Sequence, residues 1–352
     1  MRIGFDVTPL RARHGGVSTY TANLLNELCR SGRDEVVPMD SRLNKTLWMQ
    51  AVLPMQLRRL STDVCHFTNS VAPWWTPCPC VITIHDMTVW MFPKCHPRRR
   101  LLAMRPIIPL AARRASAIIA VSASTKRDLI RILGVRAEKV HVVYEAPAPH
   151  FRRLPASAAP WLEHVRARYG LPEKFVLYVG TIEPRKNLPR LLQAFTLLRA
   201  SGGEDYGLVL VGNRGWHDAE VFRGIEQLGL AACVRVVGFA PSDDLVALYN
   251  LADVMAFPSL YEGFGLPVVE AMACGTPVVT SPNGSLAEVA DAAAEFVRAS
   301  SVESIAAGLR RVISDPDRRA ELRAAGLTRA AQFSWDRSAE KTRQVYRDVV
   351  RQ

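Results

Sequence analysis

The most specific chemical pattern in this sequence is a pair of glutamates around a glycine-bearing loop, Glu262-Gly-Phe-Gly-Leu-Pro-Val-Val-Glu270. A short apolar run ends near Phe257, and Pro267 stands where a helix is expected to begin, because proline is favoured in the first turn. The glycines let bare backbone approach a ligand, and free amides at a helix start bind anions. The pattern predicts a phosphate position flanked by carboxylates that accept hydrogen bonds from hydroxyl groups. Stabilisation of the helix dipole would explain Glu270 alone, but not the pair.

A second candidate is the segment Gly180-Thr-Ile-Glu183-Pro-Arg185-Lys186-Asn187, which directly follows the apolar run Phe175–Val179. Two adjacent cations at the carboxyl end of a strand suit a diphosphate, since arginine binds it by its fork and lysine as a point charge. A solvated loop with ordinary surface charges is the alternative. The position at the end of a buried strand favours the diphosphate.

Two weaker signals lie in the first half of the chain. Gly15-Gly16 falls between the first expected strand and the first expected helix, where paired glycines allow close backbone approach. The pattern is not G-x-G-x-x-G, which argues against a dinucleotide-dependent dehydrogenase. His85-Asp86 follows the expected strand Cys80–Ile84. A lone histidine is more often structural, but a ligand of a parallel sheet binds at this end of the strands.

The elements that position these residues can be predicted from the sequence pattern. Short β-rich runs alternate with helical patterns twice along the chain. This alternation predicts an α/β protein with two doubly wound parallel sheets and a cleft between them. The strands expected in the first half are Arg2–Val7, Glu35–Met39, Asp63–Phe67, Cys80–Ile84, Ala117–Val121 and Lys139–Val143. Those expected in the second half are Phe175–Val179, Gly207–Val211, Cys233–Val237, Val254–Phe257, Pro277–Thr280 and Ala294–Val297.

The proline-rich stretch Glu145–Pro160 suggests the domain boundary, because proline lacks the amide donor that helices and sheets need. We expect a first domain over residues 1–150, a linker over 151–160 and a second domain over 161–334. A last helix over 335–352 can pack back on the first domain. The helices expected in the first half are Val17–Cys29, Lys45–Leu60, Pro97–Arg114 and Ala123–Leu133.

The composition describes a folded protein, with 49% hydrophobic and 22% charged residues among 352. No apolar signal core opens the chain and no run of eighteen uncharged apolar residues occurs, so we expect a cytoplasmic protein. The seven cysteines are odd in number. Cys65-His66, Cys78-Pro-Cys80 and Cys95-His96 fit no zinc template, and we interpret the thiols as buried rather than metal-binding.

Positive charge is concentrated in the first half. Residues 1–150 hold 21 Lys/Arg against 10 Asp/Glu, whereas residues 151–352 hold 24 against 23. Five arginines (Arg98, Arg99, Arg100, Arg113 and Arg114) flank an apolar run, and Trp74-Trp75 and Trp90-Met91-Phe92 are near in sequence. Arginine beside amphipathic aromatics is typical of a surface that rests on anionic lipid. A core position for the tryptophans and a solvated helix face for the arginines is the alternative. No nucleic-acid-binding signature is present.

Together these motifs resemble glycosyltransferase family 4. The segments EGFGLPVVE and GTIEPRKN, the early His14-Gly15-Gly16, the His85-Asp86 pair and the run AVSASTKRDL match in order over essentially the whole chain. Within the family the chain is similar to bacterial mannosyltransferases of O-antigen and capsule assembly. The resemblance implies the GT-B fold and a retaining transfer of a hexose from a nucleotide-diphosphate sugar without metal or other cofactor.

The resemblance also implies residue roles. Arg185 and Lys186 would hold the diphosphate, Glu262 the donor sugar and Glu270 the ribose, and His85 would reach the sugar or its phosphate. The residues expected at the reaction are Glu262, His85, Arg185 and Lys186, and those expected to bind substrate are Gly15, Gly16, Asp86, Glu183, Gly263, Phe264, Gly265, Leu266 and Glu270. Asp86 is the only acidic candidate near the cleft in the first domain, so we favour front-face attack by the acceptor.

The expected donor is GDP-mannose and the expected acceptor a growing glycan or lipid-linked sugar, with the protein peripheral on the cytoplasmic membrane face. A UDP- or dTDP-sugar donor carrying glucose, N-acetylglucosamine or rhamnose is an alternative. A GT-B sugar-nucleotide epimerase and a non-catalytic nucleotide-sugar binding protein are two further ones. Nucleoside diphosphate released only when acceptor is present would distinguish a transferase from both.

Overall fold

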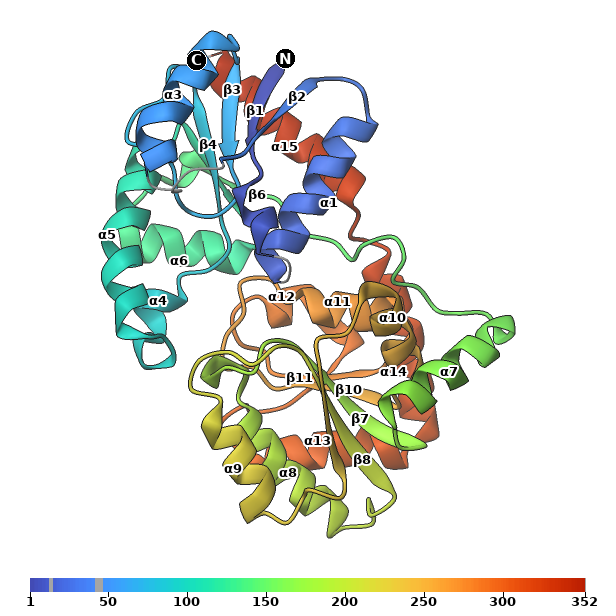
Figure 1. Cartoon of the computed structure of the whole chain (residues 1–352). Coiled ribbons are helices and arrows are strands. Elements are labelled where there is room, and N and C mark those ends of the chain that lie inside the picture. The colour runs from blue at the N-terminus through green and yellow to red at the C-terminus, as the bar shows by residue number, and fades with distance from the viewer. Residues whose placement is uncertain (13–14, 42–46, 352) are drawn as a thin grey trace. The chain divides into compact units, whose positions relative to one another are not determined.

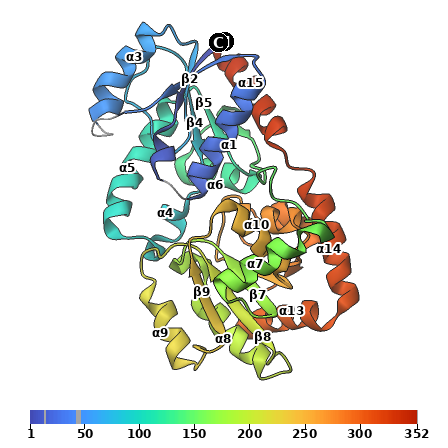
Figure 2. The same cartoon turned by 45° about the vertical axis from the view of Figure 1, so that its right-hand side comes forward.

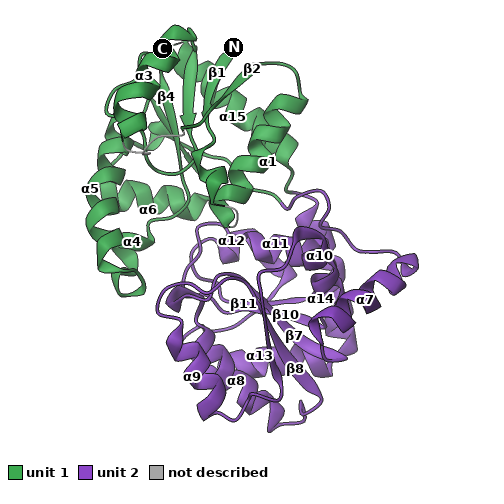
Figure 3. Cartoon of the chain, in the orientation of Figure 1, with its two compact units in different colours: residues 1–146, 333–352 green, residues 147–332 purple. Residues whose placement is uncertain are grey.

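The computed structural model describes residues 1–12, 15–41 and 47–351, and the chain divides into two compact units (Figure 1). Unit 1 consists of residues 1–146 and 333–352, and unit 2 of residues 147–332 (Figure 3). The chain therefore leaves unit 1 between Ala146 and Pro147 and returns to it at Phe333.

In the described part of unit 1, six parallel strands form one sheet in the order β2-β1-β3-β4-β5-β6. The strands are β1 (Arg2–Asp6), β2 (Glu35–Met39), β3 (Val64–Phe67), β4 (Cys80–Ile84), β5 (Ala117–Ala120) and β6 (Val140–Val142). Each expected strand is confirmed to within one residue at either end. Every residue of β3, β4 and β5 is buried, which is why these strands appear in the sequence as unbroken apolar runs.

Helices cover this sheet. They are α1 (Gly16–Arg30), a π-helical turn η2 (Trp48–Val52) that continues into α3 (Leu53–Arg59), α4 (Thr88–Met91), α5 (Arg98–Arg114) and α6 (Ala123–Leu133). The helix expected over Lys45–Leu60 is confirmed from Trp48 to Arg59, and its first residues lie outside the described ones. The helix α5 continues through Pro106 and Pro109, which lie inside it.

The last helix, α15 (Trp335–Val350), packs in unit 1 against α1, β3 and β5. Its Tyr346 hydroxyl lies 2.6 Å from Nδ1 of His66, and His66 Nε2 lies 2.8 Å from the Thr83 hydroxyl. Arg343, 2% exposed, pairs with Asp34 at 3.2 Å. A buried arginine with an ionic partner and a histidine–tyrosine bond fasten this helix to the core of the unit.

In unit 2, six parallel strands of the described chain form a sheet in the order β12-β11-β10-β7-β8-β9. The strands are β7 (Lys174–Val179), β8 (Tyr206–Val211), β9 (Val234–Gly238), β10 (Val254–Phe257), β11 (Val278–Thr280) and β12 (Glu295–Phe296). All six match the expected strands to within one residue. The helices are α7 (Ala159–Tyr169), α8 (Leu188–Arg199), α9 (Ala219–Gln227), α10 (Ser242–Leu251), α11 (Leu266–Ala273), α12 (Leu286–Ala290), α13 (Val302–Ser314) and α14 (Pro316–Ala330).

The segment expected as a linker is part of unit 2. Phe151 is buried, the Leu154 amide donates to the Asn250 side chain at 2.8 Å, and Asn250 donates back to the Arg152 carbonyl at 3.0 Å. The boundary in the structure thus lies a few residues before the expected linker. The prolines of this segment restrict its backbone. The segment packs on α10 and is not a free linker.

The strand order of each sheet indicates where a ligand would bind. In doubly wound sheets ligands bind outside the carboxyl ends of the strands, where the strand order reverses. That point lies between β7 and β10 in unit 2 and between β1 and β3 in unit 1. A ligand is therefore expected at the loops after these four strands.

Candidate functional site

Four charged side chains meet at the switch point of unit 2. Arg185 donates from Nη1 to Oε2 of Glu262 at 2.7 Å and from Nη2 to Oε1 of Glu183 at 2.6 Å. Lys186 donates from Nζ to Oε1 of Glu262 at 2.7 Å. Glu183, Arg185 and Lys186 follow β7, and Glu262 follows β10. Residues from two segments predicted separately from the sequence thus form one cluster, which we call the charge cluster.

Local structure explains this convergence. Pro184–Lys186 form a 3-10 turn that ends at Asn187, whose φ of +64° lies in the left-handed region that asparagine tolerates. The Asn187 side chain donates to the carbonyls of Pro258 at 3.0 Å and Ala299 at 2.7 Å. The Leu260 amide donates to the Arg185 carbonyl at 2.9 Å. These bonds fix the loop after β7 to the loop after β10.

The charge cluster is buried. Glu262 is 6% exposed and Lys186 is 8% exposed. Burial alone would raise the pKa of Glu262, but the Arg185 and Lys186 cations outweigh it and lower that pKa below its ordinary value. Burial lowers the pKa of Lys186, and Glu262 opposes this shift. Two carboxylates and two cations leave no net charge, so the group is stable when buried as an ion-paired set.

Glu262 and Glu270 do not lie open to solvent. Both are buried, at 6% and 7% exposed, and each has an internal partner. Sequence spacing placed both glutamates beside the loop, but it could not show their depth, because the covering residues come from other loops and helices.

Residues that the sequence did not indicate hold the loop around Glu262. The Ser285 amide and hydroxyl both donate to the Glu262 carbonyl at 3.1 Å, and the hydroxyl also lies 2.7 Å from the Phe264 carbonyl. Gly284 has a φ of +65°, and a Cβ there would lie 2.4 Å from the Glu262 carbonyl oxygen. Only glycine fits that approach.

The loop ends where α11 begins. Gly265, with a φ of +100°, precedes the helix, and Pro267 lies in its first turn. The side chains of Phe264 and Leu266 are buried, at 3% and 7% exposed. These two residues therefore offer a ligand mainly their backbone, as does Gly263.

Glu270 is held by a residue 21 positions earlier in the chain. Its Oε2 accepts a hydrogen bond from the Tyr249 hydroxyl at 3.0 Å. Burial, reinforced by the Glu270 charge, raises the pKa of Tyr249 well above its ordinary value, so the phenol remains a donor. Tyr249 lies on α10, and no motif in the sequence connects it with the glutamate.

The candidates in unit 1 form a separate group around His85. Its Nδ1 lies 3.1 Å from Oε1 of Glu145, and its Nε2 lies 2.9 Å from the Thr68 carbonyl oxygen. Burial would lower the pKa of His85, but the hydrogen bond and charge of Glu145 outweigh it and raise that pKa. Both ring nitrogens face oxygen acceptors, which the doubly protonated imidazolium satisfies best.

Two acidic side chains, Asp86 and Glu145, act on His85 in the structure. The Asp86 Oδ1 accepts from the Thr88 amide at 2.9 Å and also from the Thr88 hydroxyl, at the first residue of α4. The buried Glu145, which comes after β6, is the carboxylate that meets His85. Its neighbours in the sequence gave no signal, since they had the composition of a linker.

Gly15 and Gly16 lie where the topology places a ligand loop, between β1 and α1. Gly15 has a φ of +139°, a conformation that favours glycine, and α1 begins at Gly16. A Cβ on either residue would meet nothing within 4 Å. Conformation therefore requires glycine at position 15 but not at 16. His14, which precedes them, lies outside the described residues.

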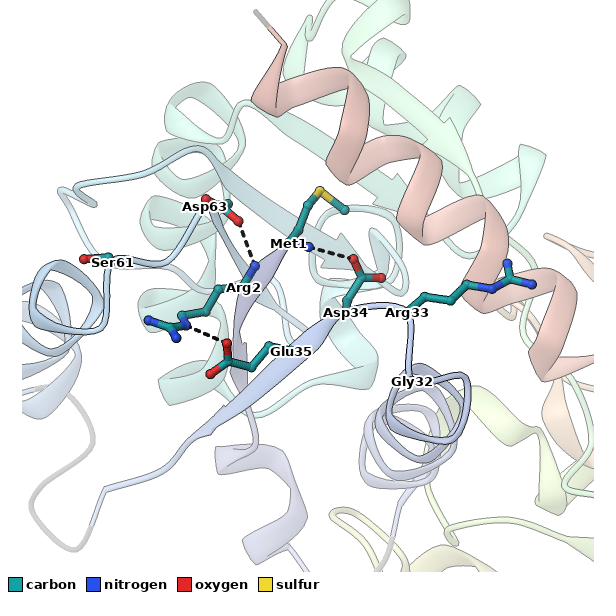
Figure 4. Close-up of a pocket in the computed structure, with 8 residues that line it drawn as sticks. All are labelled: Met1, Arg2, Gly32, Arg33, Asp34, Glu35, Ser61 and Asp63. Carbon is teal, nitrogen blue, oxygen red and sulfur yellow. Dashed lines mark hydrogen bonds and ion pairs between the residues drawn. The ribbon is translucent and has the colours of Figure 1, made fainter.

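A surface hollow in unit 1 lies at the opposite end of that unit's strands from His85. Met1, Arg2, Asp34, Glu35 and Asp63 line it at the amino ends of β1 and β2 (Figure 4). Its charges already have partners, since the Met1 ammonium lies 3.2 Å from Asp34 and Arg2 Nε lies 2.9 Å from Glu35. Because ligands of doubly wound sheets bind at the opposite ends of the strands, we assign this hollow no part in the site.

The cysteines are only partly buried. All seven are free thiols; Cys65, Cys80 and Cys274 are buried, whereas Cys29 is exposed. The interpretation of the set as buried thiols therefore holds for these three. In the part of the chain that the structure describes, no group of three or more potential ligands is arranged to hold a metal ion. None of the described helices is long and apolar enough to cross a membrane.

Solved structures with a similar backbone define the fold class. The chain matches sucrose-phosphate synthase from Thermosynechococcus elongatus with a TM-score of 0.79 at 19% identity, covering 99% of this chain and 98% of that one. It matches WaaG, a glycosyltransferase involved in lipopolysaccharide biosynthesis, with a TM-score of 0.75 at 18% identity, covering 98% and 99%. The predicted fold is confirmed: the chain has the GT-B fold, with two doubly wound units.

Sequence relatives identify the family. Residues 163–329 match the glycosyl transferases group 1 and residues 30–146 match glycosyltransferase family 4. The O-antigen chain mannosyltransferase B of Escherichia coli is 34% identical over 76% of this chain and 70% of its own length. The serotype-specific mannosyltransferase WbdA of Escherichia coli is 33% identical over 76% of this chain but only 32% of its own length. The chain belongs to glycosyltransferase family 4, and the protein is a glycosyltransferase.

Proposed function

We propose that this glycosyltransferase transfers mannose from GDP-mannose to a growing glycan or lipid-linked sugar in polysaccharide assembly, with retention of anomeric configuration and without a metal ion. The names of both Escherichia coli relatives support mannose as the sugar, and the name of the O-antigen chain mannosyltransferase B supports O-antigen as the class of product. We further propose that the protein works as a peripheral enzyme on the cytoplasmic face of the membrane. It has no role in nucleic acid binding.

The charge cluster is the observation that carries this proposal. When the bond between sugar and diphosphate breaks, negative charge grows on the leaving diphosphate, and cations held in place stabilise it. Lys186 has three N–H donors and uses one on Glu262 at 2.7 Å, so it can also donate to a phosphate oxygen. The charge of Arg185 and Lys186 is balanced by Glu183 and Glu262, but their N–H donors and the amides at the start of α11 would stabilise the leaving diphosphate in the place where other transferases use a metal ion.

The carboxylates can also accept hydrogen bonds from the sugar. Each oxygen of Glu262 accepts one bond, from Arg185 or Lys186, and a carboxylate oxygen can accept about two. A hydroxyl of the donor sugar can therefore bind Glu262 without displacing either cation. Glu270, oriented by Tyr249, would accept hydrogen bonds from the ribose hydroxyls.

A donor and acceptor screen tests the proposal. GDP-mannose, UDP-glucose, UDP-N-acetylglucosamine and dTDP-rhamnose are each incubated with a mannose-terminated oligosaccharide acceptor, with and without EDTA. We expect GDP release from GDP-mannose only when the acceptor is present, and an α-mannoside product by NMR. Release from another donor would correct the sugar, a β-linked product would overturn retention, and conversion of the donor without acceptor would indicate an epimerase.

A further inference from the structure

Large hydrophobic side chains that face solvent gather on one stretch of unit 1. Among the described residues, thirteen such side chains are exposed, and eight of them lie between Leu47 and Leu110. The eight are Leu47, Met55, Leu60, Trp74, Trp75, Leu102, Ile107 and Leu110. Trp74 is 65% exposed and Leu102 is 78% exposed. Single exposed apolar residues are ordinary, but a concentration of this kind marks an interaction surface.

The outer face of α5 supplies part of this surface. Its inner face packs through Ile108, Ala111 and Ala112, which are buried. Leu102 and Leu110, two turns apart, are both exposed and lie away from that inner face. Exposed arginines stand at both ends of the helix. The helix α5 thus buries one apolar face and exposes a second one between its basic ends. Such a helix is suited to contact an apolar partner outside the core of unit 1.

Hydrogen bonds join the tryptophan loop to this helix. The Arg114 guanidinium donates from Nη1 to the Trp74 carbonyl, and the Trp74 amide donates to Oε1 of Gln50 at 2.8 Å. The loop of Trp74 and Trp75 is thus fixed between the end of α5 and η2. Figures 1 and 2 show α3 and α5 along the same side of unit 1. We call the exposed residues of α5, this loop and the segment from Leu47 to Leu60 the basic-aromatic face.

The charges of this region are mostly positive. Residues 47–116 contain nine Lys/Arg and two Asp/Glu. Of the two acids, Asp63 accepts from the Arg2 amide and Asp86 accepts from the Thr88 amide, so the arginines outnumber the acids of this region. A partner that covers this face must therefore be anionic and must also accept tryptophan and leucine side chains.

We propose that the basic-aromatic face docks on an anionic phospholipid bilayer, with Trp74, Trp75 and Leu102 among the headgroups and the arginines on lipid phosphates. Tryptophan is enriched at the membrane interface, and basic residues beside it bind acidic lipid. A polyanion would use the arginines but would leave the tryptophans and leucines exposed. A second copy of the chain would bring the two sets of arginines together and repel. The proposal rests on the peripheral membrane association proposed above and assigns its surface and lipid class, but it does not depend on the identity of the donor or acceptor.

Vesicle binding of the full chain tests this surface. Each basic residue near an anionic membrane strengthens binding about fivefold, so Arg98→Gln with Arg99→Gln should weaken binding to phosphatidylglycerol vesicles roughly thirtyfold. Trp74→Ser with Trp75→Ser should also weaken it and should remove a blue shift of tryptophan fluorescence seen on binding. Zwitterionic vesicles should bind little, and salt should release the protein from anionic ones.

Matched changes on unit 2 serve as controls. Arg223→Gln with Arg310→Gln removes two exposed cations, and Leu197→Ser with Leu228→Ser removes two exposed leucines; neither pair should change vesicle binding. Wild-type protein that ignores anionic vesicles at low salt would overturn the proposal. Binding to heparin with equal affinity and no blue shift would assign the face to a polyanion instead, and self-association lost in the tryptophan variant would assign it to a second copy. Donor turnover on a water-soluble acceptor, measured separately, tests the proposed function alone.

Discussion

Removing the Glu262 carboxylate tests the charge cluster directly. In Glu262→Ala, Arg185 and Lys186 remain in place, only 12% and 10% exposed at their side chains, with their shared partner gone. Removing one member of a buried ion pair typically costs about 3–5 kcal/mol. For a unit of this size, 1 kcal/mol corresponds to roughly 2–4 °C, so we expect the Tm to fall by roughly 6–20 °C. Transfer activity should fall as well.

The charge-cluster hypothesis also predicts how GDP changes the loss of Tm in Glu262→Ala. In this variant Lys186 has lost its carboxylate partner and Arg185 keeps only Glu183, so the negative charge of a diphosphate can replace the lost carboxylate and GDP should raise the Tm of Glu262→Ala by more than it raises that of the wild type. Differential scanning fluorimetry with and without saturating GDP measures both effects. Glu262→Gln, which keeps one acceptor oxygen, should lose less stability than the alanine variant.

Glu295 provides a matched control in the same unit. It is also buried between two arginines, Arg311 and Arg318, but it lies on β12, away from the loops after β7 and β10. Glu295→Ala should lower the Tm by less, because the side chains of Arg311 and Arg318 are 55% and 31% exposed, and should leave the GDP effect at its wild-type size. If Glu262→Ala melts like the wild type, or if GDP stabilises it no more than it stabilises Glu295→Ala, the reasoning about the charge cluster is refuted.

Three further predictions follow from the two sites. Arg185→Ala with Lys186→Ala should weaken binding of GDP and GDP-mannose alike by calorimetry, and unchanged affinity would place the diphosphate elsewhere. Because the folded-state pKa of His85 is raised, its bond to Glu145 stabilises unit 1 fully below about pH 6.5 and less as pH rises through the folded pKa. The Tm advantage of the wild type over Glu145→Gln should therefore shrink from pH 5.5 to pH 9, and a constant difference would contradict a protonated histidine. EDTA should leave transfer unchanged, whereas a loss restored by Mg²⁺ would refute the metal-free mechanism.

The strands could be predicted from the sequence because a doubly wound sheet is buried on both faces. Such strands appear as short apolar runs, and β4, β8 and β10 are examples, since every residue in them is buried. The two loops of the charge cluster were recognisable for a related reason. Each follows a strand directly, so its charged residues had to lie at the carboxyl edge of the sheet.

The partners of the site residues could not be predicted in this way. Glu262 meets Arg185 across 77 positions of sequence, and His85 meets Glu145 across 60. Such pairs depend on which strands are neighbours, and strand order is not visible in a single sequence. The segment of Glu145 was misinterpreted as the start of a linker because its prolines dominated the composition.

The ion pairs give Glu262 a structural role in addition to the proposed binding of the sugar. A carboxylate that only received a sugar could stay hydrated until the donor arrived, but Glu262 is buried and already bonded to both cations that are proposed to hold the diphosphate. It therefore positions those cations before the donor binds, and catalysis benefits when such groups need no reorganisation during the reaction. One carboxylate with two accepting oxygens can orient both cations and still bind a sugar hydroxyl. Glutamine can do only part of this, because its amide nitrogen would face Arg185 or Lys186 as a second donor.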